Sequence, residues 1–105
     1  MPLKEIQKQV DDWVKQYKVG YFKPHEILAQ LMEEIGELAR EINHLYGPKK
    51  KKAMEKAKEM SNEIADIIFA LVCLANLKKI DLDKAFKKIM KKRYQRDKNR
   101  WERKK

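Results

Sequence analysis

The chain of 105 residues has little of what several protein classes depend on. Its single cysteine, Cys73, excludes an internal disulfide framework and a zinc site built from cysteines. Three glycines and three prolines leave little turn chemistry, which disfavours a fold of many strands. These shortages favour one small helical domain.

Long apolar segments are also absent. The longest unbroken apolar run, from Ile67 to Ala75, has nine residues and is too short to span a bilayer. The opening residues, Met1 to Glu5, do not have the character of a signal peptide. We therefore expect a soluble, cytoplasmic, single-domain protein without a membrane partner.

The net charge of +10 is unevenly distributed along the chain. The first 83 residues carry equal numbers of basic and acidic side chains, so this part is neutral. Residues 84–105 carry twelve Lys or Arg and two acids, Asp97 and Glu102. The domain 1–105 thus ends in a basic segment, 84–105, that attracts phosphates. These phosphates could belong to a nucleic acid, a free nucleotide or a membrane surface.

What the sequence does contain is helical periodicity. Apolar residues spaced by three and four predict helices over residues 3–17, 24–45 and 53–77, and a fourth that starts after an N-cap at Asp81. The second half of the third helix is apolar on every face, so it must be central. Four helices of one short chain can hardly surround it. We expect an all-α, antiparallel bundle of about four helices, completed by oligomerisation.

Each of the two central helices carries a group of closely spaced acids. Glu33, Glu34 and Glu37 belong to the second predicted helix, and Glu63 and Asp66 belong to the third. Acids three residues apart share a face, with their Cβ atoms about 5–6 Å apart. If the apolar stripes of these helices pack together, the pairs Glu34/Glu37 and Glu63/Asp66 converge. Four converging carboxylates favour proton uptake or a hard divalent cation such as Mg²⁺.

A solvated acidic face is the alternative, and spacing alone favours it. Two details favour a site. The acids at 33, 34 and 37 lack the Lys or Arg partners four residues later that a salt-bridged surface would carry. Gly36 also stands in mid-helix, where it costs about 1 kcal/mol relative to Ala, which indicates close approach of a backbone or ligand.

The pattern Glu33-Glu34-x-x-Glu37, followed after a spacer of 25 residues by Glu63-x-x-Asp66, resembles the motif of the short, single-domain MazG-like nucleoside triphosphate pyrophosphohydrolases. The apolar residues around both halves are similar as well. The resemblance implies a homodimer or homotetramer that depends on Mg²⁺, with Mn²⁺ as an alternative. It also implies hydrolysis of a (deoxy)nucleoside triphosphate to monophosphate and pyrophosphate, in cleaning of the nucleotide pool.

The resemblance assigns roles to individual residues. The implied metal ligands are Glu34, Glu37, Glu63 and Asp66, and Glu33 has an implied catalytic role in orienting water. The stretch Lys92-Arg93-Tyr94-Gln95-Arg96 is similar to the family's K-x-x-x-R pattern, so Lys92 and Arg96 are the implied ligands of the triphosphate. Neighbours such as Lys88 and Lys91 could take over these roles.

A non-catalytic, basic, helical nucleic-acid-binding protein is the alternative function. Its support is the segment 84–105, where Tyr94 and Trp101 stand among the cations. Such a protein has no use for clustered acids, so we favour the enzyme and expect no nucleic-acid partner. Among weaker candidates, Trp13 and Cys73 are expected in the core and His44 to be solvated or hydrogen-bonded. The Tyr21-Phe22 pair could equally stack on a base or support the fold, and the basic run 49–52 is expected to be a solvated loop.

Overall fold

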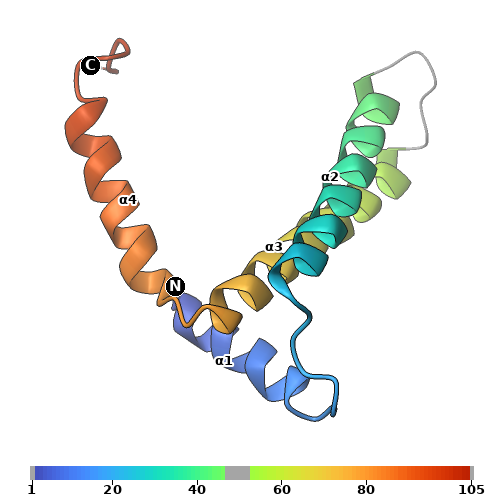
Figure 1. Cartoon of the computed structure of the whole chain (residues 1–105). Coiled ribbons are helices and arrows are strands. Elements are labelled where there is room, and N and C mark those ends of the chain that lie inside the picture. Colours follow the sequence, from blue (N-terminus) through green and yellow to red (C-terminus); the bar gives the residue numbers. More distant parts are fainter. Residues whose placement is uncertain (1, 47–52, 105) are drawn as a thin grey trace.

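In a computed structural model, which describes residues 2–46 and 53–104 and the side chains of all of these except 53–58, the chain forms four helices (Figure 1). They are α1 (Leu3–Val14), α2 (Pro24–Tyr46), α3 (Ala53–Leu77) and α4 (Leu82–Arg96). No strand occurs in the described ranges. The predicted all-α class and the four helices are confirmed. The run 49–52 lies outside the described residues.

The four helices are arranged as a V (Figure 1). α2 and α3 pack along each other as one arm, and α1 crosses α3 near the point of the V. α4 contacts mainly α1 and runs away from the body as the second arm. The antiparallel packing that the sequence predicts is therefore present between α2 and α3, while α4 does not close a bundle within one chain.

The core of the single chain is small. It is formed by α1, α2 and α3, from Val10, Val14, Ile27, Leu31, Ala70, Val72 and Cys73. No residue of α4 is buried. The radius of gyration is 17.4 Å, whereas a compact domain of about 100 residues has about 13 Å. The chain itself therefore covers only part of its apolar surface. Cys73 lies in the core, as expected, whereas its neighbours Ile68 and Leu71 are exposed, in agreement with the expectation that one chain cannot surround this helix.

The turn between α3 and α4 has a defined geometry. The N–H of Ile80 donates to the carbonyl of Ala75 (2.8 Å) and the N–H of Lys79 donates to that of Asn76 (3.1 Å), a Schellman arrangement that ends α3. Lys79 adopts the left-handed conformation that this arrangement needs, with φ of 56°. Asp81 then caps α4 by accepting from the N–H of Lys84 (3.2 Å), which confirms the predicted N-cap.

Side-chain hydrogen bonds fix the direction of α4 on α1. The carboxylate of Asp83 accepts from the backbone N–H groups of Leu3 (2.7 Å) and Lys4 (3.2 Å), which have no partner inside α1. The Gln7 side chain accepts from the N–H of Leu82 (3.0 Å) and donates to the carbonyl of Ile80 (2.7 Å). These hydrogen bonds join α1 to the start of α4 and to the turn before it, and they fix the direction in which α4 leaves the body.

The segment Glu59–Leu77 of α3 is long and apolar enough, by length and composition, to cross a membrane. The same segment carries Glu63 and Asp66 and supplies the core residues at positions 70, 72 and 73. This combination is typical of a central helix in a helical bundle.

Candidate metal and nucleotide site

The packing of α2 on α3 brings three of the four predicted metal ligands together. One carboxylate oxygen each of Glu34, Glu37 and Glu63 lie within 4.8 Å of one another. The reason is local: these acids flank the apolar stripes through which the two helices contact each other. The convergence that the spacing predicted is present, although 25 residues of chain separate Glu37 from Glu63.

The electrostatics of the cluster are unfavourable without a cation. Burial, the contact with Glu37 and the charges of Glu34 and Asp66 raise the pKa of Glu63 to about 7. Burial and the charges of Asp66 and Glu37 also raise the pKa of Glu34. The Oε2 atoms of Glu34 and Glu63 are buried and have no hydrogen-bond partner among the described residues. The cluster is therefore short of positive charge and of donors.

These features fit a divalent cation. Oxygen ligands of Mg²⁺ lie about 2.1 Å from the ion and hence about 3–4 Å from each other. The three carboxylates, within 4.8 Å, need only small side-chain rotations to reach that spacing. A cation would also satisfy the two buried oxygens that lack partners. The residues present thus suit a hard cation that prefers oxygen.

Asp66 and Glu33 lie at the edge of the cluster. Both side chains are exposed, and neither belongs to the group of three converging oxygens. The charge of Asp66 nevertheless raises the pKa values of Glu34 and Glu63, and that of Glu33 raises the pKa of Glu34. Both acids are therefore close enough to act on a ligand held by the other three.

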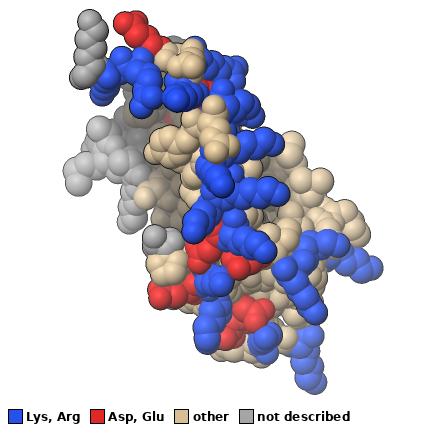
Figure 2. Space-filling view, turned by 90° about the vertical axis from the view of Figure 1, so that its left-hand side faces the viewer, with Lys and Arg blue, Asp and Glu red and all other residues tan. Residues whose placement is uncertain are grey.

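The predicted phosphate ligands Lys92 and Arg96 lie elsewhere in the single chain. Both are exposed on α4, which runs away from α2 and α3 (Figure 1). Arg96 is paired with its neighbour Asp97 (3.2 Å). Figure 2 shows Lys and Arg side chains along the whole length of α4, on the face turned away from the other arm. One chain by itself does not bring these cations to the carboxylates.

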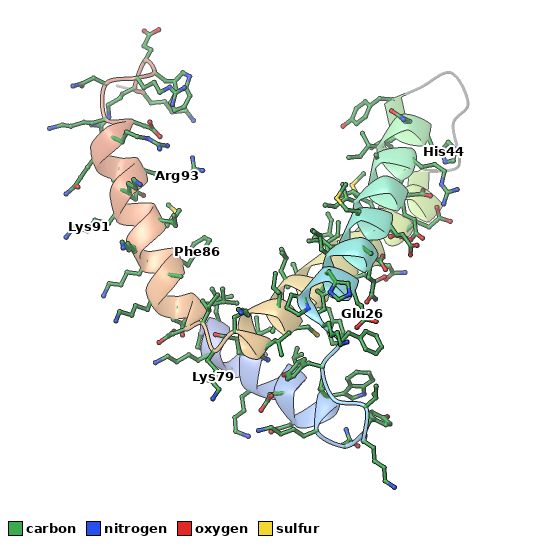
Figure 3. All side chains as sticks on the ribbon, viewed as in Figure 1. Glu26, His44, Lys79, Phe86, Lys91 and Arg93 are labelled. Atoms are coloured by element: carbon green, nitrogen blue, oxygen red, sulfur yellow. The ribbon has the colours of Figure 1, made fainter. Side chains whose placement is uncertain are left out.

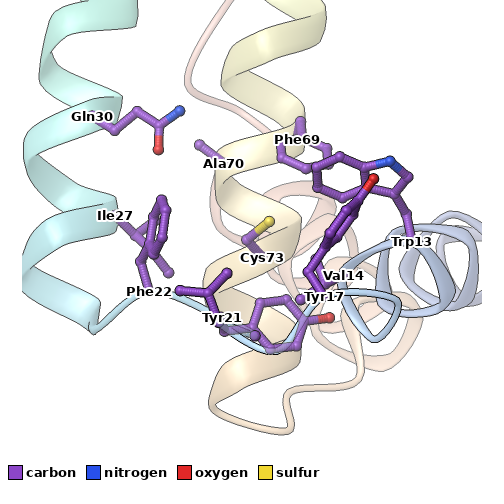
Figure 4. Close-up of a pocket in the computed structure, with 12 residues that line it drawn as sticks. Trp13, Val14, Tyr17, Tyr21, Phe22, Ile27, Gln30, Phe69, Ala70 and Cys73 are labelled. Carbon is purple, nitrogen blue, oxygen red and sulfur yellow. The ribbon is translucent and has the colours of Figure 1, made fainter.

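An aromatic pocket of about 330 Å³ lies where α1, α2 and α3 meet (Figure 4). It is lined by residues of α1, α2, α3 and the loop after α1, among them Trp13, Tyr17, Phe22, Gln30, Phe69 and Ala70. Gln30 stands one helical turn before Glu34, and Ala70 stands one turn after Asp66, so the near edge of the pocket lies about one helical turn along α2 and α3 from the acids. The size suits a small ligand.

The aromatic side chains of the pocket have distinct roles. Trp13 is half exposed and meets Tyr17 and Phe69 edge to face, with ring centroids 5.3 and 5.7 Å away. The core position expected for Trp13 is therefore wrong. The Tyr21 hydroxyl donates to Asp11 (2.6 Å) and accepts from Asn76 (3.0 Å), so it supports the fold, whereas Phe22 is half exposed.

The sequence interpretation missed several residues here. Tyr17, Gln30 and Phe69 line the pocket, and the signal for Gln30 and Phe69 was their place one turn from the acid pairs. Glu41 is buried on α2 and was not singled out from the sequence. The Nδ1 atom of His44 is buried without a hydrogen-bond partner in the described part of the chain, contrary to the expected solvation.

Gly36 has open space around it within this chain. A Cβ atom built there would meet nothing within 4 Å. The close approach expected from this mid-helix glycine is therefore not made by the described residues of the same chain.

Comparison with known proteins assigns the class. The family model described as the MazG nucleotide pyrophosphohydrolase domain matches residues 22–101, so the chain belongs to this family. It is 53% identical over 102 residues to the uncharacterised protein YpjD of Bacillus subtilis (strain 168), covering 97% of this chain and 92% of that protein. Residues 22–101, which the family model matches, include both acid pairs and α4.

Two crystal structures share the fold. That of Bacillus subtilis YpjD has a TM-score of 0.78 at 51% identity, and covers 88% of this chain and 94% of that chain. That of a Bacillus-conserved MazG protein, described as a nucleotide pyrophosphohydrolase, has a TM-score of 0.75 at 40% identity and covers 88% of both chains.

Proposed function

We propose that the chain is a Mg²⁺-dependent hydrolase that cleaves a (deoxy)nucleoside triphosphate to monophosphate and pyrophosphate, in the cytoplasm and in cleaning of the nucleotide pool. The observation that carries this proposal is the cluster of Glu34, Glu37 and Glu63, with two buried oxygens lacking partners. Its position beside an aromatic pocket, in a chain of the MazG family, supports a nucleotide as the ligand.

The carboxylates would hold the cation. Glu34, Glu37 and Glu63 are its ligands, Asp66 is a fourth from the edge of the cluster, and Mn²⁺ could replace Mg²⁺. When bound, the cation neutralises charge on the phosphates and makes water a better nucleophile. Glu33, exposed on the same flank, orients the water by accepting a hydrogen bond from it. The water oxygen bonds to the α-phosphorus and its proton is released to solvent, the bond from that phosphorus to the bridging oxygen breaks, and pyrophosphate leaves.

The pocket would hold the base. Phe22, Trp13 and Phe69 offer apolar ring surfaces to a flat ligand, and the amide of Gln30 offers one acceptor and two donors to its edge. The separation of one helical turn between pocket and acids leaves room for the sugar between base and α-phosphate. The choice of base would therefore depend on the pocket and the chemistry on the carboxylates.

The test is incubation with Mg²⁺ and each common nucleotide in turn, with release of pyrophosphate as the readout. We expect at least one nucleotide to yield pyrophosphate with the wild type and much less with Glu37→Gln. Glu5→Gln, which removes an exposed carboxylate from α1, is the control and should match the wild type. Absence of pyrophosphate with every nucleotide would contradict the proposal.

Nucleic-acid binding is the second candidate because cations cover the outer face of α4 (Figure 2). The two functions separate at Arg96. If Arg96→Ala abolishes binding to duplex DNA and leaves nucleotide turnover intact, the binding function is favoured. If turnover falls, Arg96 acts on the triphosphate.

A further inference from the structure

The side of α4 that faces the other arm differs from its outer side. Figure 3 shows Phe86 and Arg93 pointing into the V and Lys91 pointing away from it. Ile89 and Arg96 belong to the same stripe as Phe86 and Arg93, because spacings of three and four residues stay on one side of a helix. We call this stripe, Phe86, Ile89, Arg93 and Arg96, the inner face of α4. It begins apolar and ends with two arginines.

The inner face is exposed although α4 is held firmly. Phe86 is 58% exposed and Ile89 47%. Asp83 and Gln7 fix the direction of the helix through four hydrogen bonds to or from backbone atoms. A helix fixed in direction with an uncovered apolar stripe is suited to contact another molecule.

The carboxylates of the same chain are not within reach of this inner face. Figure 3 shows Glu26 and His44 on the side of α2 turned away from α4. Glu37 follows Glu26 by eleven residues and precedes His44 by seven, so at 100° per residue it lies within about 20° of both. Leu28 and Ile35 lie on the opposite side of α2, and both are exposed. Closing the V would therefore bring Arg93 to apolar side chains and not to the acids.

We propose that two copies of the chain hold each other's α2–α3 arm between the two arms of the V. The apolar inner sides of the two α2–α3 arms then contact each other, through residues such as Leu28 and Ile35. The inner face of each α4 lies over the outer, acidic side of the partner's arm. Arg93 and Arg96 of one protomer thereby complete the carboxylate site of the other.

Charge and apolar area both support a second copy as the occupant. The helix α4 carries an excess of cations. Among the described residues, the cluster of Glu34, Glu37 and Glu63 brings three carboxylates together, and the buried Oε2 atoms of Glu34 and Glu63 have no hydrogen-bond partner. The single chain is extended, with a radius of gyration of 17.4 Å, and exposes apolar residues on all three long helices. Mutual insertion covers these residues and brings the opposite charges together.

Arg93 is the new residue in this arrangement. It stands four residues after Ile89 and three before Arg96, so docking of the apolar part of the inner face carries both arginines to the partner. Their planar guanidinium groups can each bind two phosphate oxygens. Because phosphate is the ligand, this part of the inference rests on the proposed function.

The test mixes two inactive variants. Glu37→Gln removes a carboxylate, and the double variant Arg93→Ala/Arg96→Ala removes the cations of the arm. Refolded together in equal amounts, they should recover about a quarter of wild-type turnover, because in a symmetric oligomer one site in four draws intact halves from both chains. Lys84→Ala is the matched control and should be active by itself, because Lys84 is exposed and stands seven residues before Lys91, on the same outer side of α4.

The outcomes separate the inference from the proposed function. If the wild type is active and the mixture recovers nothing, each chain uses its own arginines and the inference is wrong. If the wild type turns over no nucleotide, the proposed function is wrong, and light scattering then tests the insertion. Ile89→Glu should dissociate the oligomer while Lys91→Glu should not. A monomeric wild type, or an Ile89→Glu variant that stays oligomeric, would overturn the insertion.

Discussion

At the scale of single residues, Glu63 links the stability of the chain to its chemistry. Its ordinary pKa of 4.5 is raised to about 7, by burial first and by the carboxylates of Glu37, Glu34 and Asp66 next. The folded chain thus holds this proton more tightly than the unfolded chain does. Between these two pH values, rising pH removes a proton that stabilises the fold, so the free energy of unfolding should fall.

The pH prediction concerns the metal-free protein. Its melting temperature should decrease between pH 5 and about pH 7, with Glu63 making a negative contribution to the slope. The variant Glu63→Gln, which cannot lose a proton, should show a flatter profile over the same range. Thermal unfolding at a series of pH values, in buffer with a chelator, checks this. Parallel profiles of the two proteins would mean that Glu63 does not titrate in the folded chain.

The cation prediction concerns the same cluster. Added Mg²⁺ should raise the melting temperature of the wild type, because it binds the folded chain only. Glu37→Gln and Asp66→Asn should gain much less, and without metal they should be as stable as the wild type or more stable, because repulsion is relieved. Thermal unfolding with and without Mg²⁺ measures both effects. Equal Mg²⁺ shifts in all three proteins would place any cation site elsewhere.

Tyr21 gives a further prediction at this scale. Its hydroxyl joins Asp11 to Asn76, and burial with the contact to Asp11 raises the pKa of Tyr21 to about 12. Tyr21→Phe should cost about 1 kcal/mol, a modest amount because Asp11 and Asn76 keep other partners in Lys15 and Gln7. Denaturant unfolding measures the difference. Tyr46→Phe, at an exposed position, is the control and should change nothing.

At the scale of elements, the helices were predictable and the direction of α4 was not. The periodicity predicted α2 over residues 24–45, one residue short of its observed end at Tyr46, because apolar residues recur up to Leu45 and Pro24 suits a first turn. The first helix ends earlier than its stripe predicts, at Val14, so that Tyr17 joins the pocket. The course of α4 depends on hydrogen bonds from Gln7 and Asp83, which connect residues about 75–80 apart and leave no periodic signal.

The turn before α4 carries a prediction about stability. Lys79 adopts a left-handed φ of 56°, a conformation that costs an L-residue with a side chain about 1 kcal/mol and glycine little. Lys79→Gly should therefore stabilise the chain, by up to about 1 kcal/mol. Lys78→Gly, at a neighbouring position without a positive φ, should destabilise it. Denaturant midpoints of the two variants check this, and a loss of stability in both would contradict the role of the turn.

At the scale of the whole molecule, the spacing of the acids predicted their convergence, because a helix face is fixed by sequence. Glu34, Glu37 and Glu63 meet as expected. Which cations face these acids was not predictable from the sequence, because the position of α4 relative to α2 depends on long-range contacts and not on the periodicity of any one helix. The apolar run in α3 was the one signal of assembly, and its exposed residues Ile68 and Leu71 agree with it.

Oligomerisation is the prediction at this scale. A homodimer or homotetramer should persist at low micromolar concentration, with an interface of about 2,000 Å² or more, typical of obligate assemblies. Light scattering over a dilution series measures the mass directly. A stable, folded monomer at that concentration would show that the exposed apolar residues of α3 and α4 need no partner.

The measurement that tests the central claim most directly is identification of the products from a nucleoside triphosphate in the presence of Mg²⁺. Cleavage at the α-phosphorus predicts monophosphate and pyrophosphate in equal amounts, and loss of both in Glu37→Gln. Release of inorganic phosphate with a nucleoside diphosphate, or equal turnover by the wild type and Glu37→Gln, would contradict a pyrophosphohydrolase that works at these carboxylates.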